Sequence, residues 1–301
     1  LARGRTVSLR KGAEQARELF RRHLTEERTR ELNRLQKMLE GANIKISGTI
    51  KDINGKSSRN ILELIVSGET IDSARYDLLY KQKAIAHNLK ASKEQIIDDL
   101  NGVMTDLQRK VMRVLLRHVD ELTAHISELD DDIDNFMKPE EKQAAKKIQQ
   151  VPGIGNTSAQ AVIAVIGTDM DRFPTQAHIA SWAGLCPGDN TSAKKRKSGK
   201  TRKGNQLLRA TLVNCAHSAV KNKASYFYAQ YMRISAHRGK KRAIVAVAHS
   251  ILIAIFHILK CDYPFRDLGA DYYNQFNRER KISAYLKKLK ALGWEPSPAA
   301  C

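Results

Sequence analysis

The feature that most constrains the fold is the regular spacing of apolar residues between Ser92 and Phe136. They recur every three or four residues, and Ser92 with Gln95 fits a capping box, so the segment is predicted to be one helix. About forty-five helical residues would extend about 67 Å at 1.5 Å per residue, too far for a compact domain to cover. The helix therefore needs a partner along its length. The apolar positions are Ile97, Leu100, Met104, Leu107, Val111, Leu115, His118, Leu122, Ile126, Leu129, Ile133 and Phe136.

Two partners satisfy this requirement. Residues 11 to 40 also carry apolar residues mostly three or four apart, with Gly41 as a stop, and are predicted to form a helix that could fold back on the long one. The alternative is a second copy of the chain, which would make residues 92 to 136 a coiled coil and the protein a homo-oligomer. The two arrangements do not exclude each other. We expect a mostly α fold, with a helical remnant and linker region at 1–91 and a coiled-coil helix and connector at 92–150.

The charge of the chain points to an anionic partner. Its 52 Lys and Arg against 32 Asp and Glu give a formal net charge of +20, so nucleic acid is the first partner to test and an acidic membrane surface the second. We find no run of about eighteen apolar residues and no signal peptide, and expect a cytoplasmic protein without membrane contact. The four cysteines are far apart and form no zinc-ligand pattern, so they are predicted to be reduced thiols.

The positive charge is most concentrated between Gly184 and Arg209, where one acid, Asp189, faces eight basic residues. Such a run cannot bury itself and is predicted to be a flexible loop that binds the phosphodiester backbone of nucleic acid. The basic residues are Lys194, Lys195, Arg196, Lys197, Lys200, Arg202, Lys203 and Arg209. Ser192, a hydroxyl just before them, raises a second possibility, since several cations could stabilise the charge developing on an attacked phosphate.

A second candidate contact lies at Val151–Gly155, which reads VPGIG between two predicted helices. Both Gly153 and Gly155 are predicted to adopt positive φ and to expose backbone amides at the start of the next helix. Amides placed in this way grip phosphate without selecting a base sequence, as in helix-hairpin-helix motifs. The alternative is a helical corner in which the glycines only permit close packing. Further on, Ala243 to Leu259 is the most hydrophobic helix and is predicted to be central to the core of residues 151–268, and residues 269–301 form a basic tail with a final helix.

Several motifs in this region resemble one family of bacterial insertion-sequence transposases. In that family a RuvC-like nuclease domain of DEDD type precedes a serine-bearing carboxyl-terminal transposase domain, and its members are described as bridge-RNA-guided recombinases. The matching text is VPGIG, the DRF at 171–173, HIASWAGLCPG at 178–188, SGKTRKGNQLLRATL at 198–212, and 239–260 followed by Pro264 and Phe265.

The resemblance implies a serine recombinase acting in DNA transposition, with DNA and a guide RNA as partners. The family's catalytic serine lies five residues after the proline of its AGLxP motif. Here that proline is Pro187, which makes Ser192 the nucleophile and Ser198, in the same loop, the second candidate. The family's Mg²⁺ is held by four acids of the nuclease domain, and we find no equivalent acids in this sequence. We therefore expect no metal ligand and no cofactor in this chain, and a truncated copy that is inactive alone.

A different class of function uses the same charge. A purely structural nucleic-acid-binding protein would also use the VPGIG connection and the basic loop for backbone contact, and would never cut DNA. Only Ser192, with its match to the family motif, distinguishes the two hypotheses.

Overall fold

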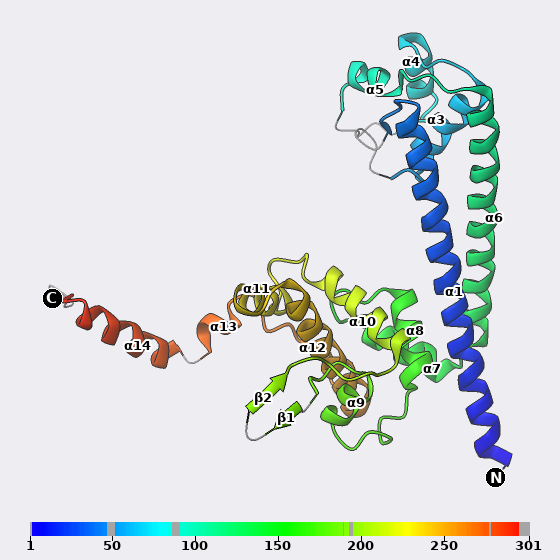
Figure 1. Ribbon diagram of the computed structural model, residues 1–301. Coiled ribbons are helices and arrows are strands. Elements are labelled where there is room, and N and C mark those ends of the chain that lie inside the picture. The colour runs from blue at the N-terminus through cyan, green and yellow to red at the C-terminus, as the bar shows by residue number, and fades with distance from the viewer. Residues whose placement is uncertain are drawn as a thin grey trace. The chain divides into compact units, whose positions relative to one another are not determined.

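The computed structural model describes residues 2–46, 52–85, 91–188, 190–192, 195–276 and 278–294. These residues are mostly α-helical, which confirms the predicted fold class, and the strands among them form one short hairpin (Figure 1). The chain divides into two compact units, one of residues 16–135 and one of residues 136–301 with residues 1–15. Each unit has its own apolar core.

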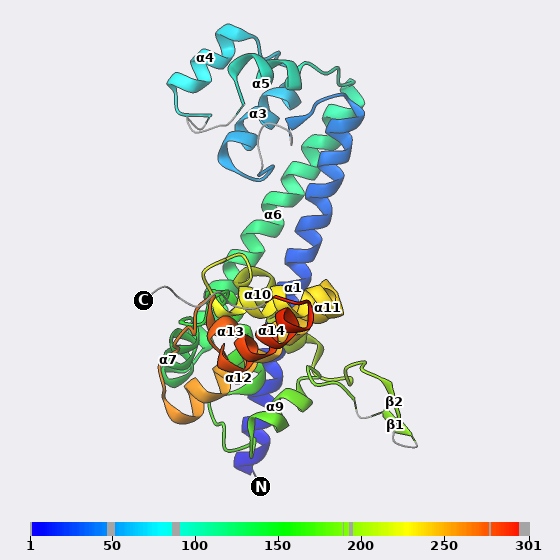
Figure 2. The ribbon, with the colours of Figure 1, turned by 90° about the vertical axis from the view of Figure 1, so that its left-hand side faces the viewer.

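The first unit is built on two long antiparallel helices, α1 (Ala2–Gly41) and α6 (Asp106–Phe136). Leu24 packs with Leu122 and Ile126 near one end of the pair, while Leu39 shares a core with Met112 near the other. Figures 1 and 2 both show the two helices side by side. The amino-terminal helix therefore folds back on α6, as one of the two predicted arrangements required. Self-association through residues 92–136 stays a prediction.

Three short helices complete this unit: α3 (Lys56–Ser67), α4 (Ser73–Lys81) and α5 (Lys93–Leu100). The Arg59 side chain on α3 forms ion pairs with Glu63 on its own helix and with Asp120 on α6. At the opposite end of the α1–α6 pair, Arg21 Nη1 lies 2.9 Å from Asp130 Oδ1. Charged pairs thus fix the register of the helices on either side of the apolar contacts.

The prediction of one continuous helix from Ser92 to Phe136 is wrong. The predicted cap is present, since Gln95 N donates to Ser92 Oγ at 3.2 Å, but α5 ends at Leu100. A Cβ added to Gly102 would overlap the backbone at Ala42 and lie 3.0 Å from Asn43 C, so the chain approaches the end of α1 more closely than a helix could. A new helix then starts at a second capping box, in which Gln108 N donates to Thr105 Oγ1 and Thr105 N to Gln108 Oε1.

The break also changes which face of α6 is buried. Leu107 and Val111, predicted to lie in the seam, are 71% and 41% exposed, whereas Met112 is fully buried. From Leu122 onward the predicted positions are correct, since Leu122, Ile126 and Ile133 are all buried. From Met112 to Val119 the buried positions of α6 therefore lie one residue later than the continuous pattern predicted.

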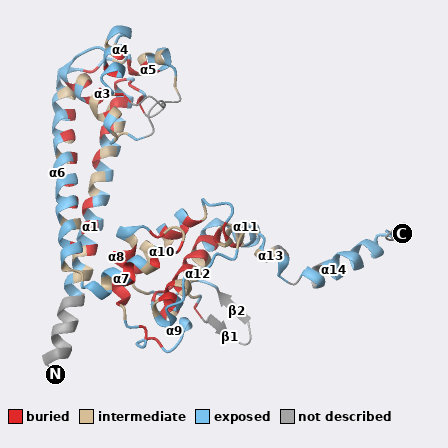
Figure 3. Cartoon of the chain, turned by 180° about the vertical axis from the view of Figure 1, so that it is seen from behind, coloured by how far each residue is buried: buried red, intermediate tan, exposed pale blue. Residues whose placement is uncertain are grey.

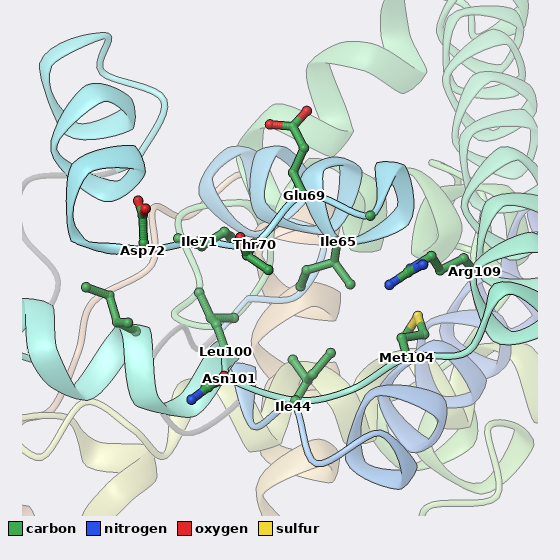
Figure 4. Close-up of a pocket in the computed structure, with 13 residues that line it drawn as sticks. Ile44, Ile65, Glu69, Thr70, Ile71, Asp72, Leu100, Asn101, Met104 and Arg109 are labelled. Carbon is green, nitrogen blue, oxygen red and sulfur yellow. The ribbon is translucent and has the colours of Figure 1, made fainter.

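A cavity of about 290 Å³ lies beside this break. Figure 4 shows Ile44, Ile65, Leu100 and Met104 around it, with the Arg109 guanidinium at one side. The cavity is lined by the ends of α3 and α5, so it results from two helices that stop at the same place.

The second unit has α12 (Lys240–Cys261) at its centre. Helices α10 (Gln206–Ala219) and α11 (Tyr226–Arg238) pack against it, and many side chains of α12 are buried in the core that they share (Figure 3). This confirms the predicted central position of residues 243–259. The remaining elements are α7 (Pro139–Ile148), α8 (Asn156–Ile166), α9 (Gln176–Trp182), β1 (Asn190–Ser192), β2 (Lys195–Ser198), α13 (Tyr272–Gln275) and α14 (Arg278–Ala291).

The statement that no segment is long and apolar enough to span a membrane is wrong for α12. An 18-residue window of this helix has a mean hydropathy of 2.1, and its length would cross a bilayer. Its residues Val247, Ile251 and Ile255 are fully buried by the other helices of the unit. Because a helix covered on most sides also needs apolar residues nearly all round, its place in the core accounts for the hydropathy.

We predict opposite outcomes for two substitutions one helical turn apart on α6. Met112→Ala should lower the free energy of unfolding by about 2–5 kcal/mol, because it empties a fully buried site. Leu107→Ala should change it by less than about 0.5 kcal/mol, because that side chain is already in solvent. Urea unfolding of the two variants tests this. Equal losses of unfolding free energy would show that Leu107 is buried, as the continuous pattern predicted.

Candidate nucleic-acid interface

The basic run of the sequence forms a β-hairpin, which replaces the predicted loop. Strands β1 and β2 pair antiparallel, with Ser192 opposite Lys195 and Thr191 opposite Arg196. The pairing continues below the strands, where Pro187 bridges to Thr201 and Gly188 N donates to Lys200 O at 2.9 Å. Figure 2 shows the hairpin extending away from the helices of its unit. Pairing satisfies the polar groups of the backbone along the described strands.

The structure describes this hairpin unevenly along its length. Lys194 and Asp189 lie outside the described residues. For Ser192 and Ser198, the two candidate nucleophiles, it describes the backbone, and the same holds for Lys195, Arg196 and Lys197. Lower in the hairpin, Lys200, Arg202 and Lys203 are described in full and are exposed, as a phosphate contact requires.

Two glycines clamp the base of the hairpin. Gly184 has φ +70°, and a Cβ added there would lie 2.8 Å from Gly204 N. A Cβ on Gly204 would lie 2.7 Å from Ala183 O and closer still to other backbone atoms. Neither position tolerates a side chain without a shift of the backbone. The two ends of the basic run therefore meet at a fixed point.

Arg209 fastens this point to α10. Its Nη1 donates to Gly184 O at 2.7 Å and to Thr201 Oγ1 at 2.8 Å. Its side chain is half-buried by this arrangement. Sequence analysis placed Arg209 among the DNA contacts, whereas its described contacts make it a positioning residue for the hairpin. Asn205, immediately before α10, accepts from Leu208 N at 3.0 Å and starts the helix at the clamp.

The VPGIG connection joins α7 to α8, and its two glycines have different roles. Gly153 has the predicted positive φ, +89°, and its Cα faces α10 so closely that an added Cβ would overlap Cys215 O and lie 2.8 Å from Ala219 N. Gly153 therefore permits close packing, the alternative weighed for this motif. The prediction of positive φ is wrong for Gly155, which has φ −90° and ψ 176° because it occupies the N-cap, a position with extended backbone.

Gly155 leaves the start of α8 open. The residue is exposed, and nothing lies within 4 Å of an added Cβ. The first amides of a helix carry partial positive charge and lack partners within the helix. A phosphate can approach them at this point without meeting a side chain of Gly155.

Helix α10 supports both features. Arg209 in its first turn holds the hairpin, and the Gly153 turn packs on Cys215. The two anchoring points are six residues apart, which is about 9 Å along a helix. Sequence analysis missed this common support, although the glycines at each end of the basic run are a sign that its ends approach one another.

Other reactive groups of the unit are unsuited to nucleophilic attack. Burial raises the pKa of the Cys186 thiol at the base of the hairpin, and burial likewise raises that of Cys215 on α10. Both thiols are thus held in the unreactive protonated form. Cys186, Cys215 and Cys261 are free, as predicted, while Cys301 lies outside the described residues. Within the described ranges, no three His, Cys, Asp or Glu side chains gather closely enough to hold a metal ion.

Comparison with known proteins identifies the same part of the chain. Residues 145–232 match the model of the transposase IS116/IS110/IS902 family. A probable family 20 transposase of Pseudomonas aeruginosa is 28% identical over 113 residues, which are 37% of this chain. That segment spans 32% of the relative's length. The family match runs from the end of α7 through the hairpin and α10 into α11, and so contains every element of the interface described above.

The two glycines of the connection should differ sharply on substitution by alanine. Gly153→Ala should lower the free energy of unfolding by at least about 2 kcal/mol, because its φ is left-handed and the new Cβ meets α10. Gly155→Ala should cost less than about 1 kcal/mol, the usual loss at an N-cap. Thermal unfolding measures both. Similar effects of the two substitutions would contradict the packing role given to Gly153.

Proposed function

We propose, from the match of residues 145–232 to an insertion-sequence transposase family, that this chain acts in DNA transposition by binding DNA through the hairpin and the start of α8. The observation that carries the proposal is the coincidence of the family match with an exposed basic hairpin. The net charge of +20 supports it, because neutralised phosphates release counterions. Contacts of this kind select the backbone of DNA and not its base sequence.

The proposed chemistry is attack of the Ser192 hydroxyl on a DNA phosphodiester. The serine oxygen forms a bond to phosphorus, one bridging P–O bond breaks, and the released strand takes up a proton, which balances the one lost by the serine. Pairing of Ser192 with Lys195 in the hairpin supports this, since it places a basic residue opposite the hydroxyl-bearing one. Cations near a phosphate under attack stabilise its added charge.

Mg²⁺ would supply further charge neutralisation in the type of transposase that the chain resembles. The described residues offer no cluster that fits the ion. We therefore assign the ion to the four acids of a RuvC-like nuclease domain, and no step of the chemistry of this chain passes through it. A guide RNA is the further partner that the same resemblance proposes.

Self-association through α6 completes the proposal. Val103, Leu107, Val111 and Val114 form an exposed apolar stripe at the start of this helix, and a second copy of the chain would cover it. The second candidate function is a protein that binds nucleic acid without cutting it. It is supported by the sequence around Ser192, where no histidine lies within ten residues to activate the hydroxyl. It shares the interface and lacks only the step at Ser192.

Removal of three cations from the hairpin should flatten the salt dependence of DNA binding. For a variant with Lys195, Arg196 and Lys197 changed to alanine, the slope of log affinity against log salt should fall by roughly 2 to 3, at about 0.9 per lost phosphate contact. The matched control changes Lys287, Lys288 and Lys290 on α14, which removes the same charge from the same unit. Equal effects of the two variants would show that DNA binding depends on the net charge of the unit and not on the hairpin.

Covalent capture of DNA tests the nucleophile. With Mg²⁺ and DNA the chain alone should form no adduct, because an unactivated serine hydroxyl is a poor nucleophile. Supplied with a RuvC-like nuclease domain of the type described, it should form one, visible as labelled DNA that stays with the denatured protein. Ser192→Ala should abolish the adduct and Ser198→Ala should keep it. The reverse pattern would identify Ser198 as the nucleophile. If both variants keep the adduct, neither serine attacks the DNA.

A further inference from the structure

A cavity of about 420 Å³ opens on the second unit, away from the hairpin in sequence. Its walls come from the start of α11, from the second half of α12 and from residues 263–268. Aromatic rings dominate these walls: Tyr226, Phe227, Tyr263 and Phe265. Phe227 is buried, so the rings that a ligand can reach are mainly those of Phe265 and Tyr263.

The aromatic wall is held in place before any ligand binds. Phe227 is buried, and its ring stacks on that of Phe265 with centroids 6.0 Å apart and planes 17° apart. Phe265 N donates to Gln150 Oε1 at 3.2 Å, which ties the 263–268 segment to the end of α7. Tyr263 is different, since 68% of its surface is exposed and no ring of the described residues stacks on it. It can therefore close over a ligand that lies against the fixed rings.

Three polar groups meet the same cavity. Ser250 Oγ accepts from Nε2 of the buried Gln230 at 2.8 Å, which leaves the hydroxyl proton of Ser250 available to a ligand. His257 Nε2 lies 2.7 Å from Gln176 Oε1, so that its ring has a fixed orientation. Arg266 is exposed at the rim. A ligand here would thus meet aromatic faces, hydrogen-bonding edges and one cation.

One arginine at the rim, Arg266, is placed to meet an anionic ligand. Asp262 Oδ1 lies 2.6 Å from Lys147 Nζ, and Asp267 accepts from Tyr226 N and Gly269 N, so neither nearby acid pairs with this arginine. Arg266 has no partner among the described residues.

We propose that this cavity binds an unpaired nucleobase of single-stranded nucleic acid, with the base against the aromatic wall and its phosphate on Arg266. The proposal rests on the proposed function, which brings nucleic acid to this unit. A paired base cannot enter, because its partner strand and stacked neighbours would have to follow it into the cavity. Stacking on aromatic rings combined with backbone cations is the usual way in which proteins hold single strands.

The experiment compares a 12-nucleotide oligothymidylate with an abasic oligomer of the same length and phosphate number. Stacking of one base should make the thymidylate bind on the order of tenfold more tightly. Tyr263→Ala should reduce this preference several-fold, and Ala254→Trp, which fills the cavity, should abolish it. Both variants should bind the abasic oligomer as the unchanged protein does, with the same salt slope. Ala236→Trp, on an exposed face of α11 outside the cavity, is the matched control and should keep the preference.

Each outcome decides between the two proposals. Equal binding of both oligomers by the unchanged protein overturns the cavity proposal and leaves the proposed function standing. A preference that survives both Tyr263→Ala and Ala254→Trp does the same. Absence of binding to either oligomer and to duplex DNA overturns both. Since Tyr263 is exposed, Tyr263→Ala removes little packing and gives a result even where Ala254→Trp unfolds the unit.

Discussion

The interface of this chain depends on how closely three backbone segments approach one another at α10. Gly153 lies against Cys215 and Ala219, Gly184 lies against Gly204, and none of the three glycines tolerates a Cβ. Arg209 then joins the glycine clamp to the helix through two hydrogen bonds. Close backbone approach of this kind fixes positions more strictly than side-chain packing, because it leaves no flexible group to adjust.

The contacts of Gly184, Gly204 and Arg209 at the base of the hairpin offset the destabilising effect of its charge. Neighbouring cations repel one another, and a two-stranded hairpin alone is marginally stable at best in water. The base of the hairpin therefore contributes to holding it in place. Leu208 and Leu212, buried on α10, connect that base to the core. Lys200, Arg202 and Lys203, close to the base, are exposed.

Much of the helical fold could be predicted from sequence, because apolar spacing reports burial directly. The central place of α12 and the cap at Ser92 followed from local patterns, and the fold-back of α1 was one of the two arrangements that those patterns allowed. The break between α5 and α6 did not, although Thr105 and Gln108 carry a capping signal, because the apolar spacing continues across it and masks the stop. The contact that requires Gly102 comes from Ala42, sixty residues away, which no local pattern reports.

The candidate site shows the same limit more strongly. Composition identified the basic run and the VPGIG connection, but not that one helix carries both. Arg209 and Lys203 carry the same charge, so the sequence does not distinguish them. In the structure Arg209 donates a hydrogen bond to Gly184 O, whereas Lys203 is exposed.

The hairpin and the aromatic cavity of the second unit are suited to different parts of a nucleic acid. Phosphates lie on the outside of any strand, so an exposed hairpin and an open helix start can reach them in a duplex or in a single strand. Bases become accessible only where a strand is unpaired, and then an aromatic cavity gains a face to stack on. Strand exchange passes through unpaired DNA by its nature. Under the proposed function, such a unit would hold the backbone through the hairpin and receive, at the Phe265 and Tyr263 rings, a base that has left its partner.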